Sequence, residues 1–246
     1  MKKTEKLPVP VTIVIPVYNE EKRIITSLEA LTAFCNKHFN EYEILCVDDG
    51  STDDTWNLIH QMRNEPFLKP LPLKKNRGKG FAVKHGMLKG CGRIRFFTDA
   101  ELPYNLDAFL AAVDIFRARR CDIVTGDRNL TGSSQELEVG VARRVAGRVF
   151  SAIATRLLQI EVSDPQCGFK GFTDYAAQEI FSRLKIPGYA FDVEIFSLAR
   201  AMNFKICRVP VSLVKHDGSK IRLIRDPFPM FFDLLKLAMW EKNRGN

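Results

Sequence analysis

The sequence predicts an α/β fold in which a mostly parallel β-sheet is flanked by helices. Apolar runs of strand length recur along the first half of the chain, segments with helical apolar spacing separate them, and polar residues follow each run. Strands joined in this way form right-handed crossovers, and ligands bind beyond their carboxyl ends. The pattern therefore predicts both the architecture and the edge of the sheet at which a site forms.

The strands and helices are expected in alternation along this first half. Residues 11–15 form a β-branched run that predicts a buried parallel strand stopping at Pro16, and residues 20–37 have the apolar spacing of a helix. The same two patterns predict further strands over 42–47, 93–98 and 122–125, and further helices over 54–62, 81–89 and 109–119.

Composition and cysteine usage limit the class of protein. With 246 residues, 46% of them apolar and 27% charged, the chain is long and apolar enough for a globular domain with a large core. Its six cysteines are scattered and no pair is spaced as Cys-x-x-Cys, which disfavours a zinc site and a disulfide framework. We therefore expect reduced thiols and a cytosolic compartment. We also expect no signal peptide, because the charged segment 1–6 passes directly into a strand pattern, and no membrane span, because no run of eighteen apolar residues occurs.

Two acidic residues follow the apolar stretch 94–98, in the triplet Asp99-Ala100-Glu101. Residues i and i+2 of a strand lie on the same face, roughly 7 Å apart. Mg²⁺ is usually held by one or two carboxylates, with phosphate oxygens and water completing its shell. A solvated turn is the alternative for the triplet alone. Polar residues also follow the other predicted strands, at 16–20, 48–51 and 126–128, and this convergence favours a metal site.

Two common nucleotide-binding motifs are missing from the sequence. Gly78-Lys79-Gly80 does not continue into the G-x-G-x-x-G fingerprint of dinucleotide-binding proteins, and no G-x-x-x-x-G-K-[ST] loop is present. These observations argue against a dehydrogenase and against a P-loop ATPase.

With these segments in view, the chain resembles family 2 glycosyltransferases of the GT-A fold, most closely the polyprenyl-phosphate hexose synthases, which make dolichyl-phosphate glucose or mannose. The resemblance is carried by residues 14–20 (VIPVYNE), 47–53 (VDDGSTD) and 76–80 (NRGKG), and it extends from about residue 11 to about 221. It implies an inverting, metal-dependent enzyme that moves a hexose from a nucleotide sugar to a polyprenyl phosphate at the cytosolic face of a membrane. Segments 164–170 and 189–194 resemble the glucose synthases more, which favours UDP-glucose over GDP-mannose.

The resemblance also implies roles for individual residues. Asp99 and Glu101 are expected to bind Mg²⁺ or Mn²⁺ on the donor diphosphate, and Lys220 and Arg128 to lie near the phosphates. The residues expected to contact the donor are Pro16, Val17, Tyr18, Glu20, Val47, Asp48, Asp49, Lys79 and Ala100. The second acid of the family's D-x-D pattern is Asp, where this chain has Glu101, and some mannose synthases have Gln where this chain has Pro103. These departures leave the choice of metal open.

The acceptor determines whether a general base is needed. A phosphomonoester has a second pKa of about 6 and is already ionised at neutral pH. A hydroxyl acceptor, on a saccharide or a protein, requires a base, for which Asp192 is the candidate. A structural carboxylate is the other interpretation of Asp192. Two further alternatives are a non-catalytic nucleotide-sugar binding module and a nucleotidyltransferase, which is expected to have a glycine-rich basic loop after its first strand.

The net charge of +8 favours an anionic partner. Nucleic acid is disfavoured because the basic residues are spread out and no recognised module is present. Residues 143–158 combine a helical apolar stripe with arginines, of which Arg143, Arg144 and Arg148 are candidates for the acceptor phosphate. We expect a catalytic domain over 1–225, with a nucleotide-sugar half at about 8–130 and an acceptor half at about 131–225. Residues 226–246 are expected to form an amphipathic tail lying on a membrane, with packing on the domain or on a second copy as the alternative.

Overall fold

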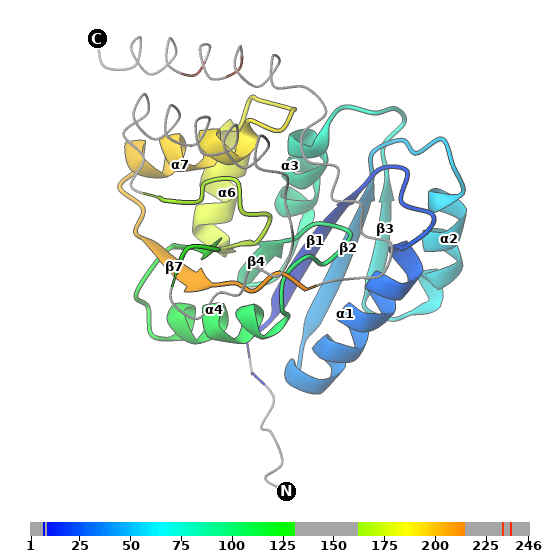
Figure 1. The fold of residues 1–246 in the computed structure, drawn as a ribbon, viewed down its shortest axis with the longest axis horizontal. Helices are drawn as coiled ribbons and strands as arrows, with labels where there is room; N and C mark the ends of the chain where they lie inside the picture. The colour runs from blue at the N-terminus through cyan, green and yellow to red at the C-terminus, as the bar shows by residue number, and fades with distance from the viewer. Residues whose placement is uncertain (1–6, 8, 131–161, 215–232, 234–236, 238–246) are drawn as a thin grey trace, which may run out of the picture.

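The computed structural model describes residues 7, 9–130, 162–214, 233 and 237. Within these residues one sheet contains seven strands: β1 Val11–Val17, β2 Tyr42–Asp48, β3 Leu68–Pro72, β4 Ile94–Phe97, β5 Ile123–Asp127, β6 Lys170–Thr173 and β7 Ile206–Pro210. Their order across the sheet is β3-β2-β1-β4-β6-β5-β7 (Figure 1). Only β6 runs antiparallel to its neighbours β4 and β5, so the predicted mostly parallel α/β sheet is confirmed.

Helices cover both faces of this sheet. The α-helices in the described residues are α1 Ile24–His38, α2 Thr55–Gln61, α3 Lys79–Lys89, α4 Asp107–Arg117, α6 Asp174–Arg183 and α7 Phe191–Ala201. Ile13 and Ile15 of β1 pack in a core cluster with α1, α2 and α4, whereas Val14 packs on the opposite face with α3, α6 and α7. Since successive side chains of a strand point to opposite faces, β1 is buried on both sides.

The first strand is longer than the sequence predicted. β1 continues through Pro16 to Val17, where Pro16 pairs with Val47 of β2. Its pairing with β4 covers only Val11 to Val14, so Pro16 lies where β1 has a single neighbouring strand. Proline is tolerated at such positions because its missing N–H interrupts no second ladder. The predicted stop at Pro16 is therefore wrong, because the strand continues two residues beyond Ile15.

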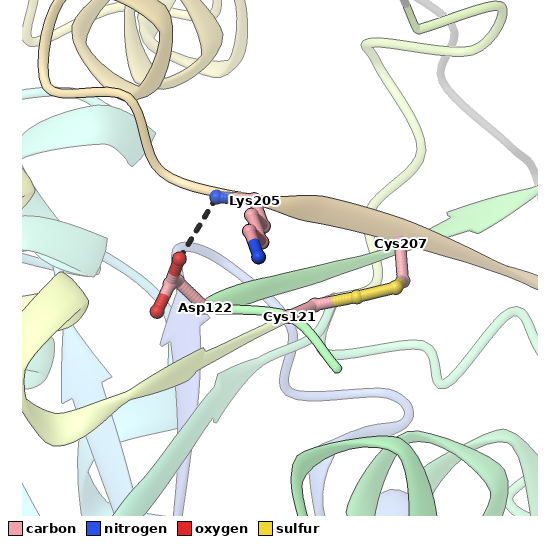
Figure 2. Close-up of a disulfide and its surroundings, with 4 residues drawn as sticks. All are labelled: Cys121, Asp122, Lys205 and Cys207. Atoms are coloured by element: carbon pink, nitrogen blue, oxygen red, sulfur yellow. Dashed lines mark hydrogen bonds between the residues drawn. A yellow bond between two sulfur atoms is a disulfide. The ribbon is translucent and has the colours of Figure 1, made fainter. Parts of the chain in front are cut away.

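One prediction about the cysteines is also wrong. Cys121 and Cys207 form a disulfide with their Cα atoms 5.9 Å apart, whereas Cys35, Cys46, Cys91 and Cys167 are free (Figure 2). The two residues are 86 positions apart in the chain and meet because β7 pairs with β5. The spacing of the cysteines in the sequence does not show that β5 and β7 are neighbouring strands. With one pair oxidised, the cysteines no longer indicate a reducing compartment.

Replacing this disulfide is expected to destabilise the fold. Cys121→Ser/Cys207→Ser removes a cross-link between distant parts of the chain and should lower the free energy of unfolding by about 2–4 kcal/mol. Urea denaturation of the double variant and of Cys91→Ser, which changes an exposed free thiol, measures the difference. Equal unfolding midpoints for the double variant and the parent protein would show that the cross-link contributes no stability.

Two predictions about the membrane side fall largely on residues that the structure does not describe. Residues 143–158 and most of 226–246 lie outside the described ranges. Leu237 is described, and it is buried against the core cluster of α3, α6 and α7, which agrees at this position with packing on the domain. Among the described helices, none is both long and apolar enough to cross a bilayer.

Candidate active site

The predicted convergence of strand ends is confirmed for β1, β2 and β4. The last residue of β1, Val17, is paired with the last residue of β2, Asp48, and the Asp49 amide donates to the Val17 carbonyl oxygen at 2.8 Å. β4 lies on the other side of β1, and the Thr98 amide just beyond it donates to the Val14 carbonyl oxygen. These ends bring 18–20, 48–49 and 99–101 to one edge of the sheet.

Asp99 is ion-paired with Lys79, the first residue of α3. The Lys79 Nζ lies 2.5 Å from the Asp99 Oδ1, and the two side chains are 20% and 27% exposed. Burial on its own would lower the pKa of Lys79, but the negative charges of Asp99 and Asp192 outweigh it and raise that pKa. Lys79 is therefore a permanent cation beside the predicted metal ligand.

Glu101 is held by a residue that the sequence analysis did not single out. Arg23 donates from its Nη1 to Glu101 Oε2 and from its Nε to Glu20 Oε2, both at 2.9 Å. Burial and the nearby charge of Asp99 raise the pKa of Glu101, and Arg23 partly opposes this rise. Arg23 thus bridges two of the predicted site residues.

The backbone around Asp99 leaves little space. Leu102 has φ of 44°, a strained value for a branched residue, and its amide donates to the Asp99 carbonyl oxygen at 2.9 Å. On the other side, a Cβ at Gly168 would lie 2.1 Å from Asp99 Oδ2. The carboxylate is therefore confined between a tight turn and the backbone of the segment before β6.

Gly168→Ala is expected to lower kcat/KM for transfer by about 100-fold while the protein still folds, because the new methyl group displaces the Asp99 carboxylate. Gly188→Ala is the matched control, since among the described residues the nearest atom to a Cβ there would be Asp233 Oδ2, at 3.6 Å. Steady-state kinetics and a thermal melt of both variants measure the effect. An unchanged kcat/KM for Gly168→Ala would show that the position of Asp99 does not control the reaction.

Asp49 positions the loop that carries Lys79. Its two carboxylate oxygens accept from the amides of Arg77 and Gly78, each at 2.8 Å. Burial raises the pKa of Asp49, and these two hydrogen bonds oppose the rise. Gly78 has φ of 97°, and a Cβ there would lie 2.5 Å from the Pro187 carbonyl oxygen, so only glycine fits. The backbone that precedes Lys79 is therefore fixed.

A cavity of about 530 Å³ opens beside the ends of these strands. It is lined by Tyr18 and Asp48, two of the predicted donor-binding residues, and by side chains that include Trp56, Lys74 and Lys75. Other predicted donor-binding residues are inaccessible as side chains: Val17 and Val47 pack in the core, and Ala100 is buried. The donor-binding roles stay predictions.

Asp192 is buried and paired. Its Oδ1 accepts from the Nζ of Lys170 at 2.6 Å, and this fully buried amine also donates to the Cys167 carbonyl oxygen at 2.7 Å. Burial raises the pKa of Asp192, while the charges of Lys170 and Lys79 oppose the rise. The ion pair agrees with the structural interpretation of Asp192, and its role as a general base stays a prediction.

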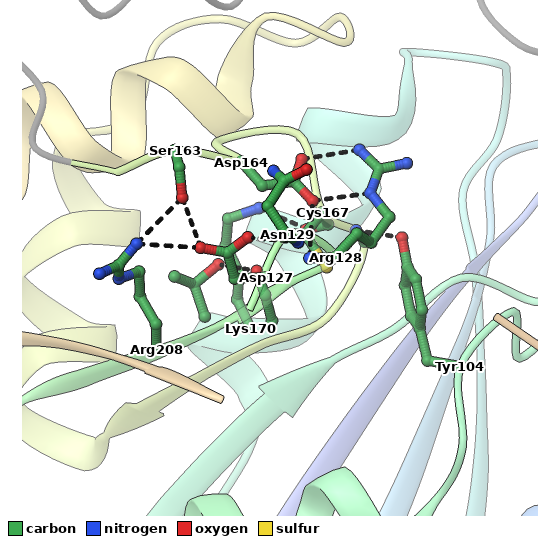
Figure 3. A network of polar contacts seen from close by, with 12 residues as sticks. Tyr104, Asp127, Arg128, Asn129, Ser163, Asp164, Cys167, Lys170 and Arg208 are labelled. Atoms are coloured by element: carbon green, nitrogen blue, oxygen red, sulfur yellow. Dashed lines mark hydrogen bonds and ion pairs between the residues drawn. The ribbon is translucent and has the colours of Figure 1, made fainter. Parts of the chain in front are cut away.

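Arg128 belongs to a second polar cluster, shown in Figure 3. It pairs with Asp164 through two hydrogen bonds of 2.6 Å, from Nε and Nη2. Next to it, Asp127 accepts from the Ser163 hydroxyl and from Arg208 at 3.1 Å. Burial alone would raise the pKa of Asp127, but these bonds outweigh it and lower that pKa. The resemblance of segment 164–170 to the glucose synthases is the one sequence signal that points to this region, and it does not identify Asp164 as the partner of Arg128.

The predicted site residues are thus only partly brought together by the described structure. Lys79, Asp99, Glu101, Glu20 and Asp192 surround one region, whereas Lys220, Arg143, Arg144 and Arg148 lie outside the described residues. The described residues contain no group of three or more His, Cys, Asp or Glu that could hold a metal by itself. Asp99 and Glu101 nevertheless fit Mg²⁺ or Mn²⁺, since such ions take their remaining ligands from phosphates and water.

Comparison with known proteins points to a single family. The sequence profile described as Glycosyl transferase family 2 matches residues 12–181. A dolichyl-phosphate β-glucosyltransferase of Dictyostelium discoideum is 34% identical over 92% of this chain and 71% of its own length. The enzyme of the same name from Saccharomyces cerevisiae is 30% identical over 93% of this chain and 74% of its own length.

Solved structures share the fold. Mannosyl-3-phosphoglycerate synthase of Rubrobacter xylanophilus has a TM-score of 0.68 at 15% identity, and the match covers 96% of this chain and 74% of that one. Glucosyl-3-phosphoglycerate synthase of Mycobacterium tuberculosis, crystallised with UDP, has a TM-score of 0.67 at 18% identity. The match covers 94% of this chain and 80% of that one. Residues 1–349 of TarS from S. aureus have a TM-score of 0.60 at 19% identity over 93% of this chain, which spans 64% of that structure.

Proposed function

Because the chain belongs to glycosyl transferase family 2, we propose that it transfers glucose from UDP-glucose to dolichyl phosphate or another polyprenyl phosphate. The observation that carries the proposal is the pair Asp99 and Glu101 at the carboxyl edge of the sheet, in a chain 34% identical to a dolichyl-phosphate β-glucosyltransferase. The curated relatives support glucose over mannose, and the UDP-bound fold relative supports a uridine donor.

The proposed reaction is a single displacement at the anomeric carbon. An oxygen of the acceptor phosphate forms a bond to C1 of glucose while the bond from C1 to the β-phosphate oxygen breaks, and UDP leaves. Because UDP-glucose is α-linked, attack from the opposite face gives a β-linked product. The names of the relatives, which specify β-glucosyl transfer, support this inverting course.

The side chains at the sheet edge have distinct roles in this proposal. Asp99 and Glu101 would hold Mg²⁺ or Mn²⁺, which when bound supplies Lewis-acid stabilisation of the departing diphosphate. Fold relatives crystallised with Mn²⁺ and UDP support the metal. Lys79 adds a permanent positive charge on the same side, and Asp49 orients the loop that carries it. Arg128, held by Asp164, and Lys220 are the further candidates for phosphate contacts.

An ionised phosphate acceptor needs no general base. This agrees with the burial of Asp192 against Lys170, which gives that carboxylate a structural partner. Transfer to a saccharide or protein hydroxyl, with Asp192 as base, is the alternative. The lipid acceptor and the apolar tail also support a peripheral position on a membrane surface, for which we propose the cytosolic face.

A radiochemical assay tests this function. The purified chain is incubated with UDP-[¹⁴C]glucose, MgCl₂ or MnCl₂ and dolichyl phosphate in detergent, and the lipid is extracted. We expect label in the organic phase, its loss with EDTA, and little label when GDP-[¹⁴C]mannose is the donor. Failure to label any polyprenyl phosphate, or label only on an added saccharide or protein, would contradict the proposal.

A further inference from the structure

Each carboxylate proposed to bind the metal is ion-paired with a basic side chain of this chain. Lys79 contacts Asp99, and Arg23 contacts Glu101. We propose that Lys79 competes with the divalent cation for Asp99 and turns to the donor diphosphate when both ligands bind, so that metal and nucleotide bind cooperatively. This inference rests on the proposed function and adds a coupling between the binding of its metal and the binding of its nucleotide.

The distances make the competition direct. The Lys79 Nζ lies 2.5 Å from Asp99 Oδ1. Mg²⁺ binds carboxylate oxygens at about 2.1 Å, so an ion on Asp99 Oδ1, the oxygen that Lys79 contacts, would lie within roughly 5 Å of that ammonium group. Both groups are positively charged in a site that is only about a quarter exposed, and their repulsion opposes metal binding.

Lys79 is the exchangeable cation of the two. Its ammonium group ends a flexible four-carbon stem with rotatable donors, although its backbone is fixed by the Asp49 and Pro187 contacts. Arg23 instead bridges Glu20 and Glu101 at 2.9 Å each, so moving it would break two ion pairs.

The second anion near Lys79 does not replace Asp99 as its partner. Asp192 raises the pKa of Lys79 by its charge, but its Oδ1 accepts from the fully buried Lys170. A diphosphate at the sheet edge offers Lys79 several strong acceptor oxygens. The nucleotide therefore draws Lys79 away from Asp99 and exposes the carboxylate to the metal.

Metal titration separates this role from catalysis. Free Mn²⁺ is measured by electron paramagnetic resonance as it titrates the wild type, Lys79→Gln, Lys79→Arg and the control Lys89→Gln, with and without UDP. Lys89 is an exposed residue at the far end of the same helix. Without UDP, we expect Lys79→Gln to bind Mn²⁺ about tenfold more tightly than the wild type does. We also expect this variant to lose most of the increase in Mn²⁺ affinity that UDP produces in the wild type. Lys79→Arg keeps the positive charge. We expect this variant and Lys89→Gln to bind Mn²⁺ with the affinity of the wild type, both with and without UDP.

The results distinguish this inference from the proposed function. Unchanged or weaker binding of Mn²⁺ alone by Lys79→Gln overturns the inference while the metal site stands. Tighter binding of Mn²⁺ by Lys79→Arg than by the wild type overturns the inference as well. If a thermal melt shows that Lys79→Gln does not fold, Lys79→Arg still provides this test. A wild type that binds no Mn²⁺ even with UDP overturns both the inference and the proposed metal dependence.

Discussion

Asp99→Asn is expected to lower metal-dependent kcat/KM by about 10³-fold, or about 4 kcal/mol of transition-state stabilisation. The substitution keeps the shape of the side chain and removes the charge that pairs with Lys79 at 2.5 Å and that would hold the metal. Because Asp99 is 27% exposed, the fold should tolerate the neutral amide. Initial rates at varied Mn²⁺ concentration, with UDP-glucose and dolichyl phosphate, measure the loss.

Asp114→Asn is the matched control for this variant. Asp114 lies in α4 with its side chain 71% exposed, and it forms a 3.7 Å ion pair with Arg117 of the same helix. Its replacement should leave both rate and stability unchanged. If Asp99→Asn retained full, metal-dependent turnover, Asp99 would not be the metal ligand and the sheet edge would need another explanation.

Lys170→Met is expected to lower the free energy of unfolding by about 3–5 kcal/mol. Lys170 has no exposed surface, and its loss leaves the buried carboxylate of Asp192 without the ammonium group that donates to it at 2.6 Å. The amine also lies 5.4 Å from the ring centroids of Phe97 and Phe196, so the site around it is largely apolar. Urea denaturation monitored by circular dichroism measures the change.

A double-mutant cycle identifies the cause of this loss. Lys170→Met/Asp192→Asn removes both charges and should recover part of the stability, which shows that the unpaired carboxylate is the main penalty. Arg117→Gln, at an exposed ion pair, should change stability by less than about 1 kcal/mol. A double variant less stable than Lys170→Met would show instead that the packing of Lys170 determines the effect.

The first half of the fold was predictable because its strands are long and buried on both faces. β1 and β2 have seven residues each, all buried, and such apolar runs are visible in a single sequence. β6 has four residues and begins with the buried Lys170, so it has no strand pattern. β3 contains Pro70 and Pro72, which are compatible with a strand only at the sheet edge, where the structure places it.

The site was predictable where it follows from strand ends and not where it depends on distant partners. Asp99 and Glu101 come directly after β4, and parallel topology places them beside the ends of β1 and β2. The partners Arg23 and Asp164 are found only in three dimensions: Arg23 lies 78 residues from Glu101, and Asp164 lies 36 residues from Arg128. Sequence alone does not determine which of many charged residues will pair. The same reason explains the missed Cys121–Cys207 disulfide.

A comparison of two acceptors tests the central claim most directly. The purified chain is given UDP-[¹⁴C]glucose and Mn²⁺ with either dolichyl phosphate or dolichol, lipids that differ only in the phosphate group. We expect glucose transfer to dolichyl phosphate and none to dolichol, because only the phosphate supplies an ionised nucleophile without a base. Transfer to dolichol at a similar rate, or transfer to neither lipid, would contradict the proposed function.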